Sequence, residues 1–136
     1  MIPSNPSSMD RASFNRAMAA ILSDHVALRR LAVDTSERGF TTDDTLSLAE
    51  AMTAHEGVEA RLFAQPLITR TPEIVSSTAA RARRRALEYT TGTFALPDRS
   101  AAAALFVDAL LAHLAAEEAW FDHESERQKE RLLISA

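Results

Sequence analysis

Two short segments of the chain pair a histidine with a glutamate at the spacing of one helical turn. The segment HEGVE holds His55 and Glu59, and the segment HLAAE holds His113 and Glu117. Side chains at this spacing lie on the same face of an α-helix and can aim at one point. Imidazole and carboxylate groups together bind hard and borderline divalent cations. The spacing therefore indicates metal binding.

Apolar residues surround both pairs at helical spacing, which places the pairs on the core-facing sides of their helices. A carboxylate in such a position loses water on folding, which costs several kcal/mol unless a partner or a metal compensates the charge. The predicted inward-facing rows are Phe14, Met18, Ile21, His25, Leu28 and Ala32; Leu48, Met52, His55, Glu59 and Leu62; Val75, Ala79, Ala82, Ala86 and Tyr89; and Ala103, Phe106, Leu110, His113, Glu117 and Trp120.

These rows predict four amphipathic helices with mostly short links. Short links make consecutive helices antiparallel neighbours, so the expected fold class is an all-α, antiparallel up-down-up-down four-helix bundle. Residues 91–99 are expected to form the longest connection, with Gly92 and Pro97 as breakers. The expected helices run from Asp10, as N-cap, to about Glu37 before Gly39; from Thr41 or Thr42 to before Pro66; from Thr71, with Pro72 in the first helical position, to about Tyr89; and from Asp98 or Ser100 to beyond residue 128.

The composition agrees with one helical domain. The chain has 136 residues, of which 46% are hydrophobic and 25% are charged, and glycine is sparse. We assign residues 10–136 to a single four-helix domain and residues 1–9, MIPSNPSSM, to a flexible leader, because proline and serine offer nothing to bury. The chain contains no cysteine. Histidine and carboxylates are therefore the only strong metal ligands.

Charge and hydropathy predict a soluble, cytoplasmic protein. A net charge of -4 and a pI near 5.5 argue against nucleic-acid binding. The basic cluster of Arg81, Arg83, Arg84 and Arg85 is expected to be a solvated face. No apolar run reaches the length of a membrane span, about 18 residues. The leader also lacks the basic and apolar regions of a signal peptide.

Antiparallel packing is expected to bring three histidines to one level. His25 lies about 12 residues before the end of its helix, and His55 lies about as many residues after the start of the next helix. In each helix this number of residues corresponds to a rise of roughly 18 Å along the helix axis. His113 lies about as deep in the last helix. Three histidines and two glutamates should therefore meet in one mid-bundle layer, whereas His123 should lie in solvent on a polar tail.

This set of residues resembles hemerythrin and the hemerythrin-like (HHE) cation-binding domains, four-helix bundles that hold a non-haem di-iron centre. The resemblance covers nearly all of the chain after the leader. It rests on His25 in SDHVALRRL, on His55 with Glu59 and on His113 with Glu117. It implies that the two glutamates bridge two iron ions, that His25 and His55 are terminal ligands of one ion, and that His113 is a terminal ligand of the other.

The second metal position is less complete in this sequence. The segment HEGVE also looks like the His-Glu-x-x-Glu of the iron-sensing F-box ubiquitin-ligase subunit, which makes Glu56 a further candidate ligand. The family's third helix normally supplies one or two histidines, but Ala79 and Ala82 stand about where these would be. Three alternatives follow: an open and labile second site, a site for one metal, or a site that has decayed.

Two functional hypotheses from different classes remain. The first is a non-haem iron protein that binds or senses dioxygen, nitric oxide or iron status. The second is a metal-free bundle that binds partners, including a second copy of itself through the long fourth helix; Glu59 and Glu117 would then hydrogen-bond to the histidines or to Arg61 or Arg85. No nucleophile–base pair, glycine-rich phosphate loop or substrate pocket is recognisable, so no catalytic residue is predicted.

Overall fold

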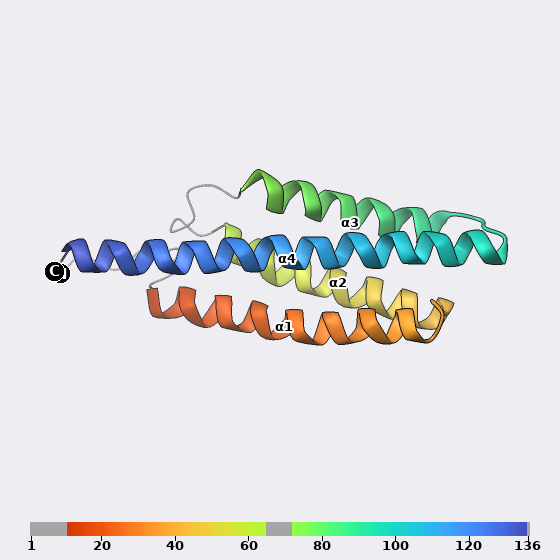
Figure 1. Cartoon of the computed structure of the whole chain (residues 1–136), viewed down its shortest axis with the longest axis horizontal. Coiled ribbons are helices and arrows are strands. Elements are labelled where there is room, and N and C mark those ends of the chain that lie inside the picture. Colours follow the sequence, from red (N-terminus) through yellow and green to blue (C-terminus); the bar gives the residue numbers. More distant parts are fainter. Residues whose placement is uncertain (1–10, 65–71, 136) are drawn as a thin grey trace.

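The computed structural model describes residues 11–64 and 72–135, with side chains for all of these except Arg11, Leu96 and residues 128–135. Four α-helices, α1 (Arg11–Glu37), α2 (Thr42–Phe63), α3 (Glu73–Thr91) and α4 (Leu96–Ser135), make up nearly all of this part, and it contains no strand. Figure 1 shows the helices lying side by side along the long axis of the molecule. The predicted all-α class with four helices is confirmed.

The turn between α1 and α2 follows the expected chemistry. Gly39 has a φ of 79°, in the left-handed region that glycine enters without steric cost, and the next residue, Phe40, has a φ of 57°. Thr41 then caps α2, because its hydroxyl accepts a hydrogen bond from the backbone N–H of Asp44 at 3.2 Å. Asp43 and Asp44 in the first turn favour this end of the helix.

Two of the predicted helix limits need correction. Pro72 is the N-cap of α3 rather than its first helical residue, and α4 begins at Leu96, so Pro97 lies inside the first turn. Proline is tolerated there because the first N–H groups of a helix have no intrahelical partner. The link between α3 and α4 is therefore residues 92–95, shorter than the predicted connection of residues 91–99. The predicted leader and the Asp10 cap lie outside the described residues.

The helices pack as two hairpins. α1 packs on α2 and α3 packs on α4, while α1 also contacts α4. Nearly all members of the four predicted inward-facing rows are buried; Met18, Ala79 and Trp120 are only partly so. The buried apolar residues form two clusters, one around Leu48, Phe106 and Leu110 and the other around Phe14, Ile21, Leu62 and Phe121.

The long helix α4 is apolar over much of its length. The stretch Pro97–Arg127 is long and apolar enough to cross a membrane by length and composition alone. In its most apolar window 44% of the residues are buried inside the bundle. The stretch also carries the buried His113 and Glu117, so its apolar side faces the other helices.

Candidate metal centre

A layer of polar residues lies between the two apolar clusters. His25 lies between the buried Ile21 and Leu28 on α1, and Glu117 lies between the buried Leu114 and Phe121 on α4. The apolar neighbours on both sides exclude water, so ionised groups in this layer must compensate one another or hold a counter-ion. Five predicted ligands are almost fully buried here: His25, His55, Glu59, His113 and Glu117.

The Nε2 atoms of the three histidines all face the two carboxylates. His25 Nε2 lies 3.0 Å from Glu117 Oε1 and 3.7 Å from Glu59 Oε1. His113 Nε2 lies 3.4 Å from Glu117 Oε1 and 3.6 Å from Glu59 Oε2, and His55 Nε2 contacts Glu59 Oε1. One ligand atom from each of His25, His55, Glu59 and Glu117 lies within 4.8 Å of the other three. The predicted convergence on one layer is confirmed.

The other nitrogen of each imidazole, Nδ1, is held by a group at the edge of the layer. The Nδ1 atoms of His25, His55 and His113 lie 2.9 Å from Glu118 Oε2, 3.1 Å from Asp24 Oδ2 and 3.0 Å from Thr78 Oγ1, respectively. Metal-binding histidines usually donate their second ring N–H to a carboxylate or another acceptor, which fixes the tautomer and the ring orientation.

Thr78 determines which nitrogen of His113 carries the proton. Its hydroxyl lies 2.7 Å from the carbonyl oxygen of Ile74 and donates there, so its oxygen accepts from His113 Nδ1. His113 Nε2 then faces Glu117 Oε1 at 3.4 Å and Glu59 Oε2 at 3.6 Å.

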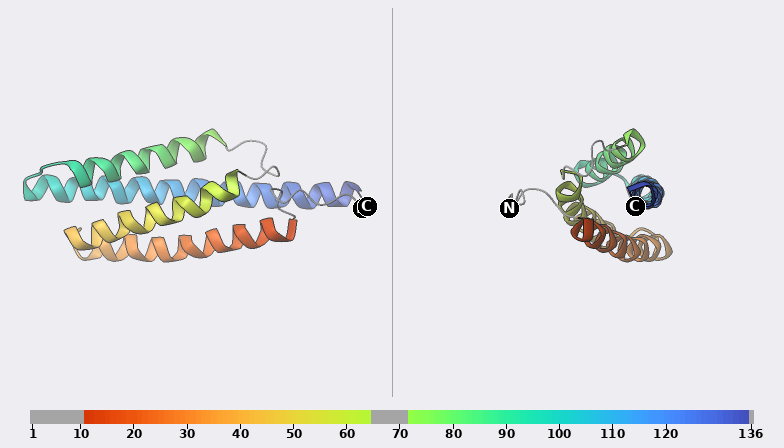
Figure 2. Two further views of the ribbon diagram at one scale, coloured as in Figure 1. Left: turned by 180° about the vertical axis from the view of Figure 1, so that it is seen from behind. Right: turned by 90° about the vertical axis from the view of Figure 1, so that its left-hand side faces the viewer.

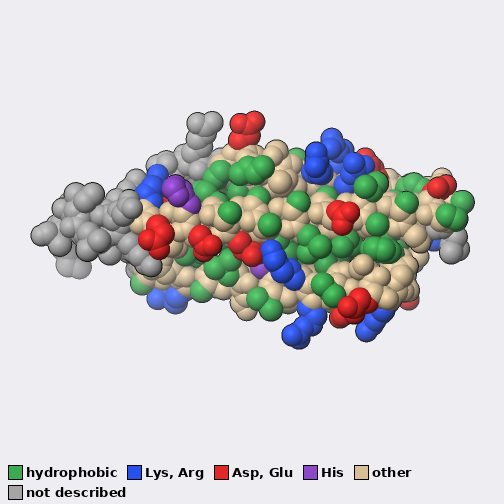
Figure 3. Space-filling view, viewed as in Figure 1, with side chains coloured by type: hydrophobic (Ala, Val, Ile, Leu, Met, Phe, Trp, Pro, Cys, Tyr) green, Lys and Arg blue, Asp and Glu red, His purple; other side chains and the backbone are tan. Residues whose placement is uncertain are grey.

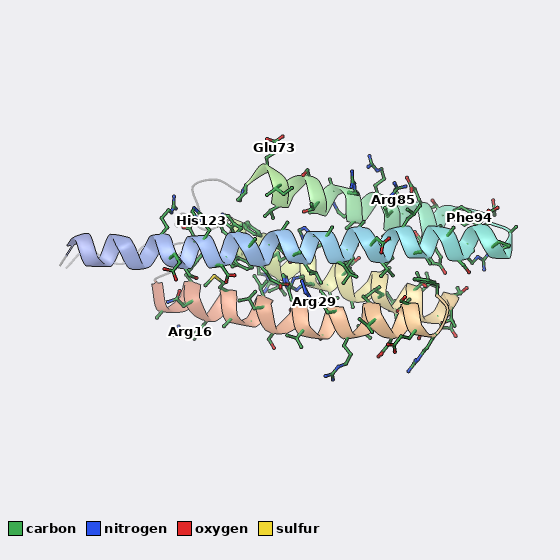
Figure 4. All side chains as sticks on the ribbon, viewed as in Figure 1. Arg16, Arg29, Glu73, Arg85, Phe94 and His123 are labelled. Carbon is green, nitrogen blue, oxygen red and sulfur yellow. The ribbon has the colours of Figure 1, made fainter. Side chains whose placement is uncertain are left out.

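Glu118 is in turn held by Arg29. The guanidinium of Arg29 lies 2.8 Å from Glu118 Oε2, and Figure 4 shows Arg29 at the seam between α1 and α4. His25 therefore lies between two carboxylates, one buried and one anchored at the surface. Sequence reasoning missed Asp24, Thr78 and Glu118. The only signal was that Asp24 precedes one candidate ligand and Glu118 follows another.

Without a cation beside them, the two buried carboxylates of Glu59 and Glu117 cannot both be ionised, because like charges so close together repel each other. Burial, together with the neighbouring Glu59, raises the pKa of Glu117 to about 7 against the opposing hydrogen bond from His25. Burial also disfavours ionised Glu59, but the close contacts of its carboxylate with the imidazoles of the three histidines outweigh burial and lower its pKa. Burial would lower the pKa of His25, but its hydrogen bonds to carboxylates outweigh this and raise the pKa to about 9. A bound cation would take the place of the proton on His25.

Several inward-facing atoms of the layer have no hydrogen-bond partner. These buried atoms are Nε2 of His55 and His113, Oε1 of Glu59 and Oε2 of Glu117. His55 Nε2 and Glu59 Oε1 contact each other, and His113 Nε2 lies 3.4 Å from Glu117 Oε1, so these atoms crowd together without hydrogen-bond geometry. Buried polar atoms are nearly always hydrogen-bonded, so this arrangement needs an explanation. Metal–ligand bonds of about 2.1 Å set neighbouring ligand atoms roughly 3–3.5 Å apart, close to the spacings in this layer. The donor set therefore fits a cation.

The remaining predicted residues lie outside this group. Glu56 is half-buried at the α2–α3 side, where its Oε1 lies 3.5 Å from Arg83 Nη1; burial raises its pKa, and Arg83 opposes that shift. Ala79 faces the layer from α3 without a ligand atom. His123 is exposed on α4, as predicted, and Figure 4 shows it toward the C-terminal end of that helix.

The basic cluster on α3 does not neutralise the buried carboxylates. Arg85 Nη1 pairs with Glu88 at 3.0 Å on the surface of its own helix, and Arg61 is exposed. Figure 3 shows basic side chains gathered on the outer side of α3. The prediction of a largely solvated basic face is confirmed for Arg81, Arg83 and Arg84, which are exposed.

Replacement of Thr78 by valine is expected to weaken metal binding. Valine has nearly the same shape but cannot accept the hydrogen bond from His113 Nδ1, so the ring loses its fixed tautomer. Changes of this kind lower metal affinity by about 10- to 100-fold. Competition titration with a coloured chelator measures the effect. Ser77→Ala is the matched control, because the exposed Ser77 hydroxyl bonds only to the carbonyl of Ile74. Equal affinities in the two variants would show that Thr78 does not position His113.

Comparison of the chain with protein-family models, with curated proteins and with solved structures gives no match.

Proposed function

We propose that this protein is a metal-binding four-helix bundle whose buried layer holds one cation between His25, His55, Glu59 and Glu117. The observation that carries the proposal is the asymmetry of the imidazoles: every Nδ1 atom has an outer partner, while the three Nε2 atoms crowd against two buried carboxylates at the centre. A divalent cation satisfies them together and allows both carboxylates to ionise.

We further propose that the metal is iron and that the chain is a hemerythrin-like protein. The order of ligands along the helices supports this, because the first helix supplies a histidine and the second and fourth each supply a histidine and a glutamate. The alternating course of the chain in Figure 1 supports the antiparallel up-down-up-down arrangement of that family. Nitrogen and carboxylate ligands without thiolate suit iron, although they also suit manganese and zinc.

Iron held in this way would bind or sense a small molecule. Ferrous iron with an open coordination position supplies the ability to bind dioxygen or nitric oxide. The residues of the chain contribute orientation and exclusion of water. Glu118, Asp24 and Thr78 fix the three imidazole rings, and the two apolar clusters keep bulk water from the layer above and below.

The α3 side determines how many ions the site can hold. Ala79 and Ala82 offer no ligand atom, so a second ion would have to use His113, the two glutamates and Glu56. Glu56 is half-buried and paired with Arg83, so it would have to leave that partner. We therefore propose one firmly held ion and a second position that is open toward α3.

Elemental analysis of the purified protein tests this proposal. The protein should be purified anaerobically from cells supplied with iron. The metal-to-protein ratio should then be measured by inductively coupled plasma mass spectrometry. A ratio of at least one is expected, and a ratio near two would indicate that the second position is also filled. A ratio near zero for all transition metals would contradict the proposal.

The alternative is a metal-free bundle, and one observation favours it. With its pKa raised to about 9, His25 is a cation at neutral pH and can balance the negative charge of Glu59 without any metal. The polar layer would then specify the packing of the helices, and the protein would act as a structural or protein-interaction module. This alternative predicts that chelators leave the stability of the protein unchanged.

A further inference from the structure

A small cavity lies beside the candidate metal centre, between α2 and α3. Its volume is about 200 Å³, and its lining includes the buried His113 and Glu59 together with Ala79. His113 is only 4% exposed, and its Nε2 atom has no hydrogen-bond partner. The small side chain of Ala79 leaves this side of the layer open. The cavity therefore gives a molecule larger than a diatomic gas access to the edge of the centre.

A larger, mostly apolar groove continues from this cavity along the same two helices. Its volume is about 700 Å³, and it shares Glu56 and Arg83 with the cavity, so the two spaces meet at these residues. Met52, Ala86 and Leu87 are among its apolar lining residues. The groove exists because α2 and α3 belong to different hairpins and are not among the closely packed helix pairs. Figure 2, from behind, shows α4 in the background between them.

The groove has a cationic group where it meets the cavity. Arg83 is exposed, and one of its nitrogen atoms, Nη1, lies 3.5 Å from Glu56 Oε1. An exposed ion pair of this length is weak. The guanidinium has five N–H donors in a planar fork, so it can bind a second carboxylate through two parallel hydrogen bonds. Among the lining residues Arg83 is the one cation, and it lies beside the carboxylates of Glu50 and Glu56, so it matches at most one anionic head on an apolar tail.

We infer that the groove and the cavity bind an amphipathic monocarboxylate, with the carboxylate at Arg83 and the aliphatic tail between α2 and α3. The groove extends along α2 from Leu46 to Glu56, roughly 15 Å at 1.5 Å per residue, which accommodates an aliphatic chain of medium length. A polyanion fits less well, because Arg83 is accompanied by the acidic side chains of Glu50 and Glu56. The proposed position of the carboxylate head rests on the proposed metal centre, because a bound cation removes the repulsion from the buried carboxylates of Glu59 and Glu117. The proposed position of the aliphatic tail rests on the groove alone.

Calorimetric titration with octanoate tests this inference on the full chain, both metal-loaded and stripped of metal. Octanoate should bind, butyrate should bind at least about tenfold more weakly because it buries fewer methylene groups, and 1-octanol should bind about tenfold more weakly because it lacks the charge. Affinity for octanoate should be higher in the metal-loaded protein. Absence of octanoate binding to both forms, or equal affinity for octanoate and 1-octanol, would overturn the inference.

Paired surface variants locate the ligand. Arg83→Gln should weaken octanoate binding by about tenfold, whereas Arg84→Gln, exposed on the same helix but outside the groove, should not. Leu87→Gln should weaken it by roughly fourfold, whereas Ile74→Gln, equally exposed on α3, should not. An equal loss of octanoate affinity in the two variants of either pair would show that octanoate binds elsewhere. If the wild-type protein is a dimer and Leu87→Gln makes it a monomer, a second copy of the chain covers the groove. That result would also overturn the inference.

The metal ratio of the same samples separates this inference from the proposed function. Bound metal without octanoate binding would leave the metal centre intact and refute the ligand site. Octanoate binding that depends on Arg83 and Leu87 in a protein that takes up no metal would support the ligand site and refute the metal centre. Absence of both would refute both.

Discussion

Glu59→Leu is expected to abolish the stabilisation that metal gives to this protein. Chelation should lower the stability of the metal-loaded wild type by on the order of 3–4 kcal/mol, as expected for a ligand near a thousandfold above its Kd. For a chain of this size that corresponds to a fall in Tm of roughly 10 °C. The variant loses a carboxylate that contacts all three histidines, so chelator should leave its Tm unchanged.

The same variant separates the two functional hypotheses once both proteins are stripped of metal. Leucine removes a desolvated charge and nearly keeps the bulk of glutamate, while His25 retains Glu117 and Glu118, and His55 retains Asp24. The stripped variant should therefore be as stable as the stripped wild type, or more stable by about 1–4 kcal/mol. Thermal melting with and without chelator measures both effects.

Glu124→Leu is the matched control for this experiment. It removes another buried carboxylate of α4, one that pairs with Arg127 outside the polar layer, so its response to chelator should equal that of wild type. If wild type contains no metal, melts at one temperature with and without chelator, and is no more stable than Glu59→Leu, the iron hypothesis must be abandoned in favour of a hydrogen-bonded layer.

Ala79→His is expected to raise iron occupancy, and Ala82→His is expected to destabilise the bundle. The proposed resemblance to hemerythrin-like domains places third-helix ligands at about these two positions, but the structure distinguishes them. Ala79 is partly exposed and borders a cavity of about 200 Å³, so an imidazole has space beside His113. Ala82 is 1% exposed within the larger apolar cluster, where a larger side chain costs about 1–3 kcal/mol.

Metal titration and melting of the three α3 variants measure these effects. Ala79→His should bind iron at least about tenfold more tightly than wild type if an additional imidazole completes the open position. Ala80→His, which points to solvent from the same helix, is the control and should bind as wild type does. Equal iron binding by Ala79→His and Ala80→His would show that the α3 side is not the deficient side of the site.

Much of the site could be predicted because helical periodicity and helix rise are local properties. The rows through His25, His55 and Glu117 follow from steps of three and four residues, and equal distances from the turn set His25 and His55 at one level. Those predictions need no knowledge of the exact rotation of each helix. The continuation of the α4 row also explains why Glu124 is buried, although the tail was expected to be polar.

The outer partners and the groove could not be predicted, because they depend on how the helices are rotated and spaced. Asp24 is exposed and reaches His55 across the α1–α2 pair, and Thr78 reaches His113 from α3 to α4. Each contact would be lost with a modest rotation of one helix, a quantity that hydrophobic periodicity does not define. The gap between α2 and α3 likewise depends on hairpin docking. The start of α4 was misplaced because Pro97 was interpreted as a breaker rather than as a residue of the first turn.

Anomalous X-ray diffraction from crystals of the iron-loaded protein, collected on both sides of the iron absorption edge, tests the central claim most directly. An iron peak is expected in the buried layer, between the Nε2 atoms of His25 and His55 and the carboxylates of Glu59 and Glu117. A second, weaker peak on the His113 side would mark the open position. A layer without any peak, in which the histidines and glutamates hydrogen-bond only to one another while iron is bound elsewhere or not at all, would contradict this claim.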